Sequence, residues 1–295
     1  MRLVLTLVAR DFDALQEALP PALEAVAGAG RPVLDTQVLG EGAADIFTEG
    51  DDPAPLRALV DRALERQSVD FCVQPANGRK KALLVADMDS TIIGCECLDE
   101  LADFAAIKHE VAAITARAMA GDINFEAALR ERVGLLAGLE LAALHATYDT
   151  RVRLNPGART LARTMAAHGA RCILVSGGFQ FFSQRVARDA GFAAHRANTL
   201  LDDGARLTGA VAEPILGREA KLAALIEEAE ALGVGLEATL AVGDGANDLA
   251  MIEAAGLGVA YRAKPIVAAR ADARLDFADL SALLYFQGYG ADAFA

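Results

Sequence analysis

From residue 82 onward the chain alternates apolar, strand-like runs with helical segments, and this alternation restricts the possible folds more than any other feature. The run "KALLVAD" is continuously apolar between Lys81 and Asp87, as expected for a strand covered on both faces of a parallel sheet. The runs "RCILVS", "ATLAVGD" and "LGVAY" have the same character. We therefore expect an α/β domain with a doubly wound, Rossmann-like parallel sheet over residues 82–295.

Helical segments separate these strands, and one block of them is unusually long. Residues 98–147 contain no good strand candidate, so we expect a helical cap at about 95–155, inserted after the first strand. Shorter helices are expected near 158–168, 180–190, 218–232 and 246–255. The segment "RANTLLDDGARLTGAV" should form a hairpin, because Asp203-Gly204 is a favoured two-residue turn.

Residues 1–75 follow a different order, and we expect them to form a separate small domain. Strands are predicted at 3–9, 33–39, 43–48 and 69–74, and helices at 13–27 and 53–67. This βαββαβ order predicts a small α+β, ferredoxin-like domain. The polar segment 76–81 contains Asn and Gly, which predicts a linker.

Length and composition limit the classes of protein to which the chain can belong. Its 295 residues, 54% of them hydrophobic, suffice for one large or two ordinary domains with a sizeable core. The net charge of −13, with no long basic run, argues against a nucleic-acid partner. No apolar run approaches the roughly 18–20 residues that cross a bilayer, and "MRLVLTLVAR" is expected to be a strand rather than a signal peptide. For the same reason we expect no membrane partner. The four cysteines do not form a zinc pattern, so we expect free thiols, as in a cytoplasmic protein.

Polar residues gather where the predicted parallel strands end. Because ligands of such sheets bind beyond the carboxyl ends of the strands, these residues are expected to share one rim. The first strand leads into "DMDST", the second into "SGG" and the third into "GDGAND", while a lysine lies near the start of an intervening helix. The residues with candidate chemistry are Asp87, Asp89, Ser176, Gly177, Lys221, Asp244, Asn247 and Asp248.

Several carboxylates on one rim would repel one another unless something neutralised them. Mg²⁺ takes oxygen ligands and needs only one or two carboxylates besides a phosphate oxygen, so it fits this set. Lys221 and the backbone N–H groups of the glycine loops can hold a phosphate dianion. We therefore predict a Mg²⁺-dependent site for a small phosphate ester. A similar pair, Asp11 and Asp13, has no partner loops and is expected only to cap a helix.

The four motifs, in this order, resemble those of the haloacid dehalogenase (HAD) phosphohydrolase superfamily, and the resemblance covers roughly residues 80–290. The helical block resembles the cap that this superfamily inserts after its first strand. More narrowly, "DSTIIGCECLDELA" and "AMAGDINFEAALRERVGLL" resemble the phosphoserine phosphatase family. The resemblance implies Mg²⁺-dependent hydrolysis of O-phosphoserine to serine and phosphate, the last step of serine biosynthesis, through an aspartyl-phosphate intermediate.

The resemblance also implies a role for each motif residue. Asp87 matches the nucleophile, which also binds Mg²⁺, and Asp89 matches the general acid and base, whose backbone carbonyl binds the metal. Asp244 matches the second metal carboxylate, and Asp248 acts near the metal, through water. The positions that bind and stabilise the phosphoryl group correspond to Ser176, Gly177, Lys221 and Asn247.

The cap positions matched by the resemblance suit a substrate that carries both an ammonium and a carboxylate group. Glu96 and Arg132 match the residues that bind these two groups, and Met119 matches another lining position. Phe125 and Arg132 are seven residues apart, nearly two helical turns, on a helix that Asn124 can cap, so both project from one face. Taken singly, Glu96, Phe125 and Arg132 are each explained better by a structural role. Together these three residues favour a substrate-binding role.

The N-terminal domain is similar in its element order to ACT-like amino-acid-sensing modules. Its first strand–helix junction reads "ARDFDAL" and lacks the glycine that ligand-binding modules often have there. We therefore favour a packing or oligomerisation role, such as a homodimer contact, over serine binding. Two other functions stay open from the sequence. One is a related enzyme that acts on another small phosphate ester or passes the phosphoryl group to an alcohol, and the other is an amino-acid-sensing regulatory protein.

Overall fold

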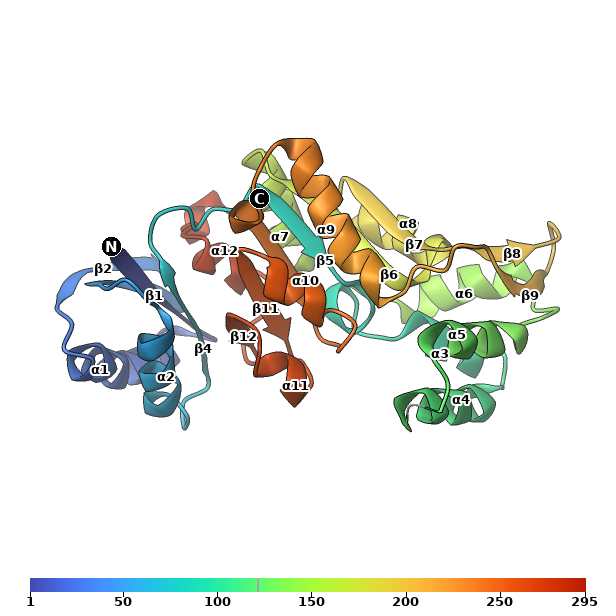
Figure 1. Cartoon of the computed structure of the whole chain (residues 1–295), viewed down its shortest axis with the longest axis horizontal. Helices are drawn as coiled ribbons and strands as arrows, with labels where there is room; N and C mark the ends of the chain where they lie inside the picture. Colours follow the sequence, from blue (N-terminus) through green and yellow to red (C-terminus); the bar gives the residue numbers. More distant parts are fainter. Residues whose placement is uncertain (121) are drawn as a thin grey trace.

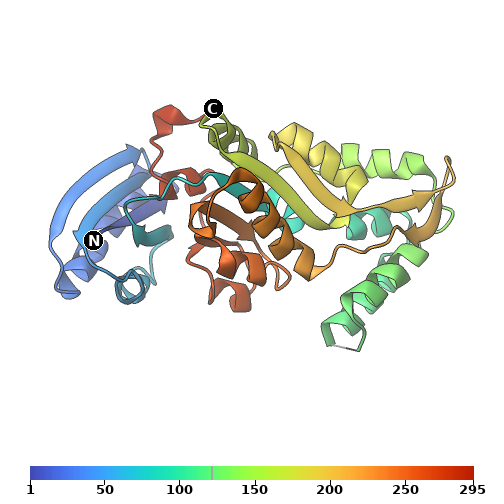
Figure 2. The same ribbon diagram turned by 45° about the horizontal axis from the view of Figure 1, so that its top comes forward.

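The computed structural model describes residues 1–120 and 122–295, and the side chains of all of these except 119 and 120. The chain forms three bodies in a row: the N-terminal domain, a central sheet covered by helices, and a helical cap at the opposite end (Figure 1). A second view gives the same order (Figure 2). The expected class, a parallel α/β domain with a helical cap and a small N-terminal α+β domain, is confirmed. Within the described ranges, no helix is both long and apolar enough to cross a membrane.

The N-terminal domain consists of β1 (Arg2–Ala9), α1 (Phe12–Gly28), β2 (Val33–Gly40), β3 (Ala43–Glu49), α2 (Ala54–Ala63) and β4 (Val69–Pro75). Its antiparallel sheet has the strand order β2-β3-β1-β4, which is ferredoxin-like. Leu5 and Leu7 of β1 pack with Leu15 of α1 and Leu56 of α2, so the domain has a hydrophobic core of its own. Helix α2 ends at Ala63, four residues earlier than the sequence pattern predicts.

Asp11 caps the first helix. Its carboxylate accepts the backbone N–H of Ala14 at 2.9 Å, which satisfies one of the free donors at the start of α1. The capping interpretation of this second aspartate pair is therefore confirmed for Asp11, while Asp13 lies in the first turn of the helix.

The central domain has a parallel sheet in the order β12-β11-β10-β5-β6-β7. Its strands are β5 (Leu83–Ala86), β6 (Arg171–Phe179), β7 (Ala194–Asn198), β10 (Thr239–Gly243), β11 (Leu257–Tyr261) and β12 (Ala273–Leu275). The accompanying helices are α7 (Ala158–Ala167), α8 (Gln180–Ala190), α9 (Arg218–Leu232), α10 (Leu249–Ala254), α11 (Pro265–Ala268) and α12 (Ala282–Phe286). Strand β5 lies between β6 and β10, and the strand order reverses there. The carboxyl ends of these three strands therefore border the crevice where such sheets bind ligands.

The helical cap consists of α3 (Cys97–Phe104), α4 (Lys108–Ala120), α5 (Phe125–Gly134) and α6 (Leu141–Arg151). A two-stranded ribbon, β8 (Leu200–Asp202) and β9 (Leu207–Val211), contacts α5 and extends the cap (Figure 1). The predicted hairpin is wrong at its start, because residues 196–198 complete β7, which pairs in parallel with β6. Only the ribbon around Gly204, whose φ is 94°, is a hairpin.

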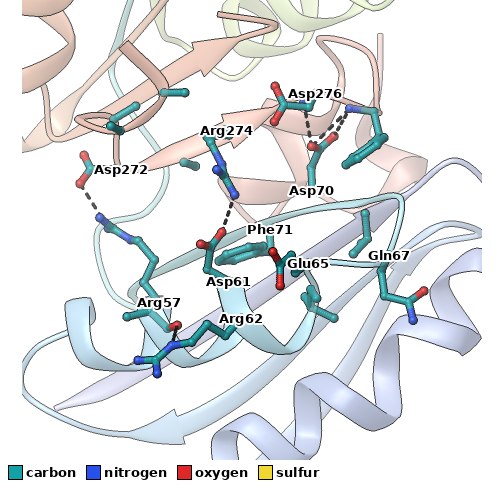
Figure 3. A pocket seen from close by; sticks show the side chains of 18 of the residues that line it. Arg57, Asp61, Arg62, Glu65, Gln67, Asp70, Phe71, Asp272, Arg274 and Asp276 are labelled. Carbon is teal, nitrogen blue, oxygen red and sulfur yellow. Dashed lines mark hydrogen bonds and ion pairs between the residues drawn. The ribbon is translucent and has the colours of Figure 1, made fainter. Parts of the chain in front are cut away.

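The two sheets meet at their edge strands, β4 of the N-terminal domain and β12 of the central domain. The buried carboxylate of Asp70 accepts the backbone N–H groups of three consecutive residues, at 2.7 to 3.3 Å (Figure 3). These residues are Asp276, Phe277 and Ala278. A cavity of about 650 Å³ lies beside this contact, and the ion pairs Arg57–Asp272 and Asp61–Arg274 bridge the domains along it.

The predicted linker, residues 76–81, joins β4 to β5 and is fixed at its end. Lys81 is buried, and its backbone N–H donates to the side chain of Gln287 at 3.1 Å. Its ammonium donates to the backbone carbonyls of Glu237 at 2.8 Å and Gly256 at 3.4 Å. The segment therefore anchors the start of β5 to the central domain.

Candidate active site

Asp87 follows β5 directly, at the centre of the sheet. Its backbone N–H donates to the carbonyl of Val242 on β10 at 3.0 Å, which places Asp87 beside the end of that strand. The chain then turns sharply, with Ser90 in the left-handed region at a φ of 59°, a strained conformation for a serine. The Ser90 N–H donates to the carbonyl of Cys95 at 3.2 Å and closes the turn. The "DMDST" segment is thereby held at the rim.

A buried lysine joins two of the carboxylates. The ammonium of Lys221, in the first turn of α9, donates to Asp87 and to Asp248 at 2.5 Å each. Burial alone would lower the pKa of Lys221, but the two carboxylates outweigh it and raise that pKa above its ordinary value. Burial, followed by repulsion from Asp248, raises the pKa of Asp87 well above its usual range. Lys221 therefore stays charged and partly offsets the negative charge of this buried pair.

Asp89 is oriented by groups from two other elements. Its Oδ1 accepts the backbone N–H of Cys97 at 2.9 Å, and its Oδ2 accepts the hydroxyl of Ser176 at 3.1 Å. Gly178 leaves room for this carboxylate, since a Cβ there would lie 2.8 Å from Oδ2. Burial, followed by the charge of Glu96, raises the pKa of Asp89 to about 6. A carboxyl group with this pKa can both donate and accept a proton near neutral pH.

Asp87, Asp244 and Asp248 form an oxygen cluster that fits a divalent cation. One carboxylate oxygen from each lies within 4.8 Å of the others. Thr91 orients Asp244 by donating its hydroxyl at 3.0 Å, while burial and the charge of Asp248 raise the pKa of Asp244 to about 6. All-oxygen donors of this kind suit Mg²⁺, and a bound cation would relieve the repulsion among them. The side chain of Asp89 is not part of the cluster, so a metal contact from this residue would have to come from its backbone carbonyl.

The end of β6 supplies neutral donors beside the carboxylates. Ser176 accepts the N–H of Gly178 at 2.9 Å while it donates to Asp89, so its hydroxyl is fixed in direction. The side-chain amide of Asn198, at the end of β7, donates to the carbonyl of Gly177 at 2.9 Å. Its carbonyl oxygen accepts the N–H of Leu216 at 2.7 Å. Asn198 thus ties the "SGG" loop to the segment that leads into α9 and Lys221.

The cap contributes the opposite wall. Glu96, which precedes α3, accepts the hydroxyl of Ser90 at 2.6 Å. Arg132 on α5 donates to a backbone carbonyl of its own helix at 3.2 Å and forms no ion pair among the described residues. Desolvation lowers the pKa of Arg132. Phe125 lies against Gly177, where a Cβ would be 3.2 Å from the ring. Asp99 of α3 also lines the cavity, so the wall presents two anions, one cation and one aromatic ring.

These side chains enclose a cavity of about 330 Å³ between the rim and the cap. The predicted site residues that line it are Asp87, Asp89, Glu96, Phe125, Arg132, Ser176, Gly177, Asp244 and Asn247. Lys221 and Asp248 are buried, and Lys221 contacts both Asp87 and Asp248. The predicted lining position Met119 falls outside the residues whose side chains the structure describes. The interdomain cavity is larger, but several of its charged side chains already pair across the domain boundary, so we place the candidate active site at the rim.

Several residues that contact or line the site, among them Ser90, Thr91, Asn198 and Lys264, were not assigned a role from the sequence. Ser90 and Thr91 orient Glu96 and Asp244, and their position inside "DMDST" is a signal that identifies them. Asn198 and Lys264 lie outside the four motifs, and no local sequence signal marks either one.

Residues 84–253 match the family model described as haloacid dehalogenase-like hydrolase. The chain belongs to this family. It is 40% identical over 234 residues to a phosphoserine phosphatase of Archaeoglobus fulgidus, which covers 79% of this chain and 68% of the relative. It is 44% identical over 207 residues to a phosphoserine phosphatase of Polaromonas sp., which covers 68% of this chain and 88% of the relative.

One solved structure matches nearly the whole chain. The crystal structure of a probable phosphoserine phosphatase from Vibrio cholerae superimposes with a TM-score of 0.77 at 30% identity, over 99% of this chain and 88% of that one. The match therefore includes the N-terminal domain as well as the HAD-like hydrolase domain.

Proposed function

We propose that this HAD-like hydrolase is a phosphoserine phosphatase, which hydrolyses O-phosphoserine to serine and phosphate with Mg²⁺ and through an aspartyl phosphate. The observation that carries the proposal is the set of side chains around one cavity. Asp87, paired with Lys221, lies at its rim, and Glu96 and Arg132 lie in its cap wall. Phosphoserine has a phosphate at one end and an ammonium and a carboxylate at the other, so this cavity is complementary to it. In this proposal the reaction is the last step of serine biosynthesis, in the cytoplasm.

In the first step, an oxygen of the Asp87 carboxylate attacks phosphorus. The bond between phosphorus and the serine oxygen breaks, and the phosphoryl group is transferred to Asp87. Protonated Asp89 donates its proton to the leaving serine oxygen, a contribution of about 10²–10⁴-fold. Lys221 and the donors around Ser176 stabilise the charge on the transferring oxygens, which is the dominant contribution in phosphoryl transfer.

In the second step, the deprotonated Asp89 takes a proton from a water molecule. That water attacks phosphorus, the bond between phosphorus and Asp87 breaks, and phosphate leaves. Both carboxyl groups return to their starting states. When bound, Mg²⁺ supplies positive charge at the phosphoryl oxygens, held by Asp87, Asp244 and the backbone carbonyl of Asp89, with Asp248 nearby.

Selectivity for phosphoserine is assigned to the cap. The planar guanidinium of Arg132 suits the substrate carboxylate, and Glu96 suits the ammonium group. Ser90 holds the Glu96 carboxylate in place at 2.6 Å. Phe125 closes the wall over Gly177, while Asn247 offers an amide to the phosphate.

A phosphate-release assay tests the proposal. The protein is incubated with phosphoserine, phosphothreonine and simple sugar phosphates, with and without Mg²⁺. Mg²⁺-dependent release of phosphate from phosphoserine supports the assignment. If no ester releases phosphate, an amino-acid-sensing regulatory protein is the better interpretation. Homoserine added as an acceptor identifies a phosphotransferase, because phosphohomoserine would then accumulate at the expense of phosphate. Asp87→Asn serves as the inactive control.

We further propose that the N-terminal domain pairs with a second copy of the chain along β2. This strand is at the edge of its sheet, and Val33, Leu34 and Val38 on it are 42%, 47% and 77% exposed. Exposed apolar edge strands favour pairing, and an edge that pairs with its own copy forms a closed two-fold dimer. Sedimentation over a range of concentrations should show a dimer that Val38→Lys weakens. A monomeric wild type, or a dimer unaffected by Val38→Lys, would rule out this contact.

A further inference from the structure

One cation on the central domain lines the active-site cavity without belonging to any of the four motifs. Lys264 follows β11 and precedes α11, whose first residue is Pro265. Its backbone N–H donates to the carbonyl of Asp244 at 3.2 Å, so the residue lies next to the carboxylate cluster. Lys264 lines the cavity together with Asp244 and Asn247, which also belong to the central domain.

The ammonium of Lys264 is available to a ligand. In the part of the chain that the structure describes, no carboxylate lies within 4.0 Å of it. Lys221, in contrast, is already bound to Asp87 and Asp248. The other cation in the lining, Arg132, belongs to the cap wall. Among the described lining residues, Lys264 is therefore the cation that the central domain offers at the cavity surface.

Before a metal ion binds, the side chains that line the cavity carry more negative than positive charge. Five carboxylate residues line it against two cations, Arg132 and Lys264. The five are Asp87, Asp89, Glu96, Asp99 and Asp244. A phosphate monoester is a dianion at neutral pH, so it enters against this charge. A cation on the wall lowers that barrier and raises the local concentration of the anion.

We propose that Lys264 is a substrate-binding residue that recruits the phosphate dianion into the cavity from the central-domain side. The inference rests on the proposed function, since it assumes a phosphate ester as substrate. It goes further by assigning phosphate recruitment to a lysine outside the four motifs. The support that Lys264 gives to Asp244 comes from its backbone N–H, so a side-chain substitution leaves that bond in place and isolates the contribution of the ammonium group.

The test compares Lys264→Gln with Lys264→Arg and with a matched control, Arg270→Gln. Arg270 is exposed, lies just beyond α11 and does not line the cavity, so its substitution removes the same charge from the same region. We expect Lys264→Gln to lower kcat/KM for phosphoserine about three- to tenfold at low ionic strength, through KM, with kcat nearly unchanged. The loss should shrink as salt shortens the screening length. Lys264→Arg should restore most of the loss, and Arg270→Gln should change little.

A second readout does not depend on turnover. The inhibition constant of inorganic phosphate should rise in Lys264→Gln by a similar factor and with the same salt dependence. Unchanged constants, a salt-independent fall in kcat, or an equal effect of Arg270→Gln would each overturn the inference. Wild-type protein that releases no phosphate from phosphoserine would instead refute the proposed function, so the two failures are distinguishable.

Discussion

At the scale of single residues, the candidate site concentrates buried charge that the fold itself does not require. Burial raises the pKa of both Asp89 and Asp244 to about 6. A carboxyl group whose pKa rises on folding binds its proton more tightly in the folded state than in the unfolded chain. Its charged form therefore destabilises the folded protein at neutral pH. This cost is expected of residues positioned for a metal and for proton transfer.

Asp89→Asn should make the metal-free protein more stable at pH 7.5, by about 1–3 kcal/mol. The asparagine oxygen can still accept the N–H of Cys97, while the buried charge is gone. The sign follows from the pKa change: the penalty is absent below the unfolded value of 3.8, grows as pH rises, and is complete above about 6. Urea unfolding of both proteins without Mg²⁺, at pH 5 and 7.5, measures it. If the two proteins have the same free energy of unfolding at pH 7.5, or differ more at pH 5 than at pH 7.5, the charge of Asp89 does not destabilise the folded protein.

Truncation of the cap charges should impair phosphoserine more than an ester that lacks an ammonium and a carboxylate. A lost hydrogen bond to a charged group is worth about 1.5–3 kcal/mol, or roughly 10–150-fold in kcat/KM. Arg132→Ala and Glu96→Gln should each show a loss of this size on phosphoserine, and Arg132→Lys an intermediate one because it keeps the charge without the planar fork. Para-nitrophenyl phosphate is the comparison substrate. Equal losses on both substrates would mean that these residues only hold the cap in place.

At the scale of elements, the sequence predicted what depends on local pattern and missed what depends on distant contacts. Continuous apolar runs identified β5, β10 and β11, because a strand covered on both faces needs no alternation. The motif residues were expected to meet because carboxyl ends of parallel strands share an edge. The segment β12, α11 and α12 was not predicted, since its elements have only three to five residues. Asn198 was missed because its partners, Gly177 and Leu216, are set by the packing of β7 against β6.

Substitutions at the start of α1 test whether Asp11 and Asp13 contribute to stability alone or also to activity. Asp11→Ala should lower the free energy of unfolding by about 0.5–2 kcal/mol, because the N–H of Ala14 loses its acceptor. Phosphatase activity should stay unchanged at temperatures where the variant is folded. Asp13→Asn is the matched control, with a smaller effect expected because Asp13 does not make the capping bond. Loss of activity at normal stability in either variant would mean that the N-terminal domain joins the chemistry.

At the scale of the whole molecule, one buried carboxylate connects the two domains. Asp70 lies on an edge strand of the N-terminal domain and satisfies three successive backbone N–H groups that follow β12. Burial raises the pKa of Asp70, while these hydrogen bonds oppose the rise. The neighbouring ion pairs Arg57–Asp272 and Asp61–Arg274 are partly exposed, so each contributes little. Asp70 therefore acts together with the buried Gln74–Phe286 hydrogen bond, and with Val8 and Leu39, which pack into the hydrophobic core of the central domain.

Asp70→Ala should destabilise the protein by about 1–3 kcal/mol, because three partly buried backbone N–H groups lose their charged acceptor. We also expect faster proteolysis in segment 76–81, since the two domains are held together less tightly. Arg62→Gln is the control, because Arg62 is an exposed residue that lines the same interdomain cavity. It should change neither the free energy of unfolding nor the rate of proteolysis. Unchanged unfolding and proteolysis in Asp70→Ala would show that the domains are held by other contacts.

The central claim is that Asp87 receives the phosphoryl group of phosphoserine, and direct observation of that intermediate tests it best. The protein is mixed with O-phosphoserine and Mg²⁺, quenched in acid during turnover, digested and analysed by mass spectrometry. One phosphoryl group is expected, on Asp87. Asp87→Asn is expected to have the same circular dichroism spectrum as the wild type and neither to form the phosphoprotein nor to release phosphate. A phosphoryl group on another residue would show that Asp87 is not the nucleophile. So would phosphate release by Asp87→Asn at the wild-type rate.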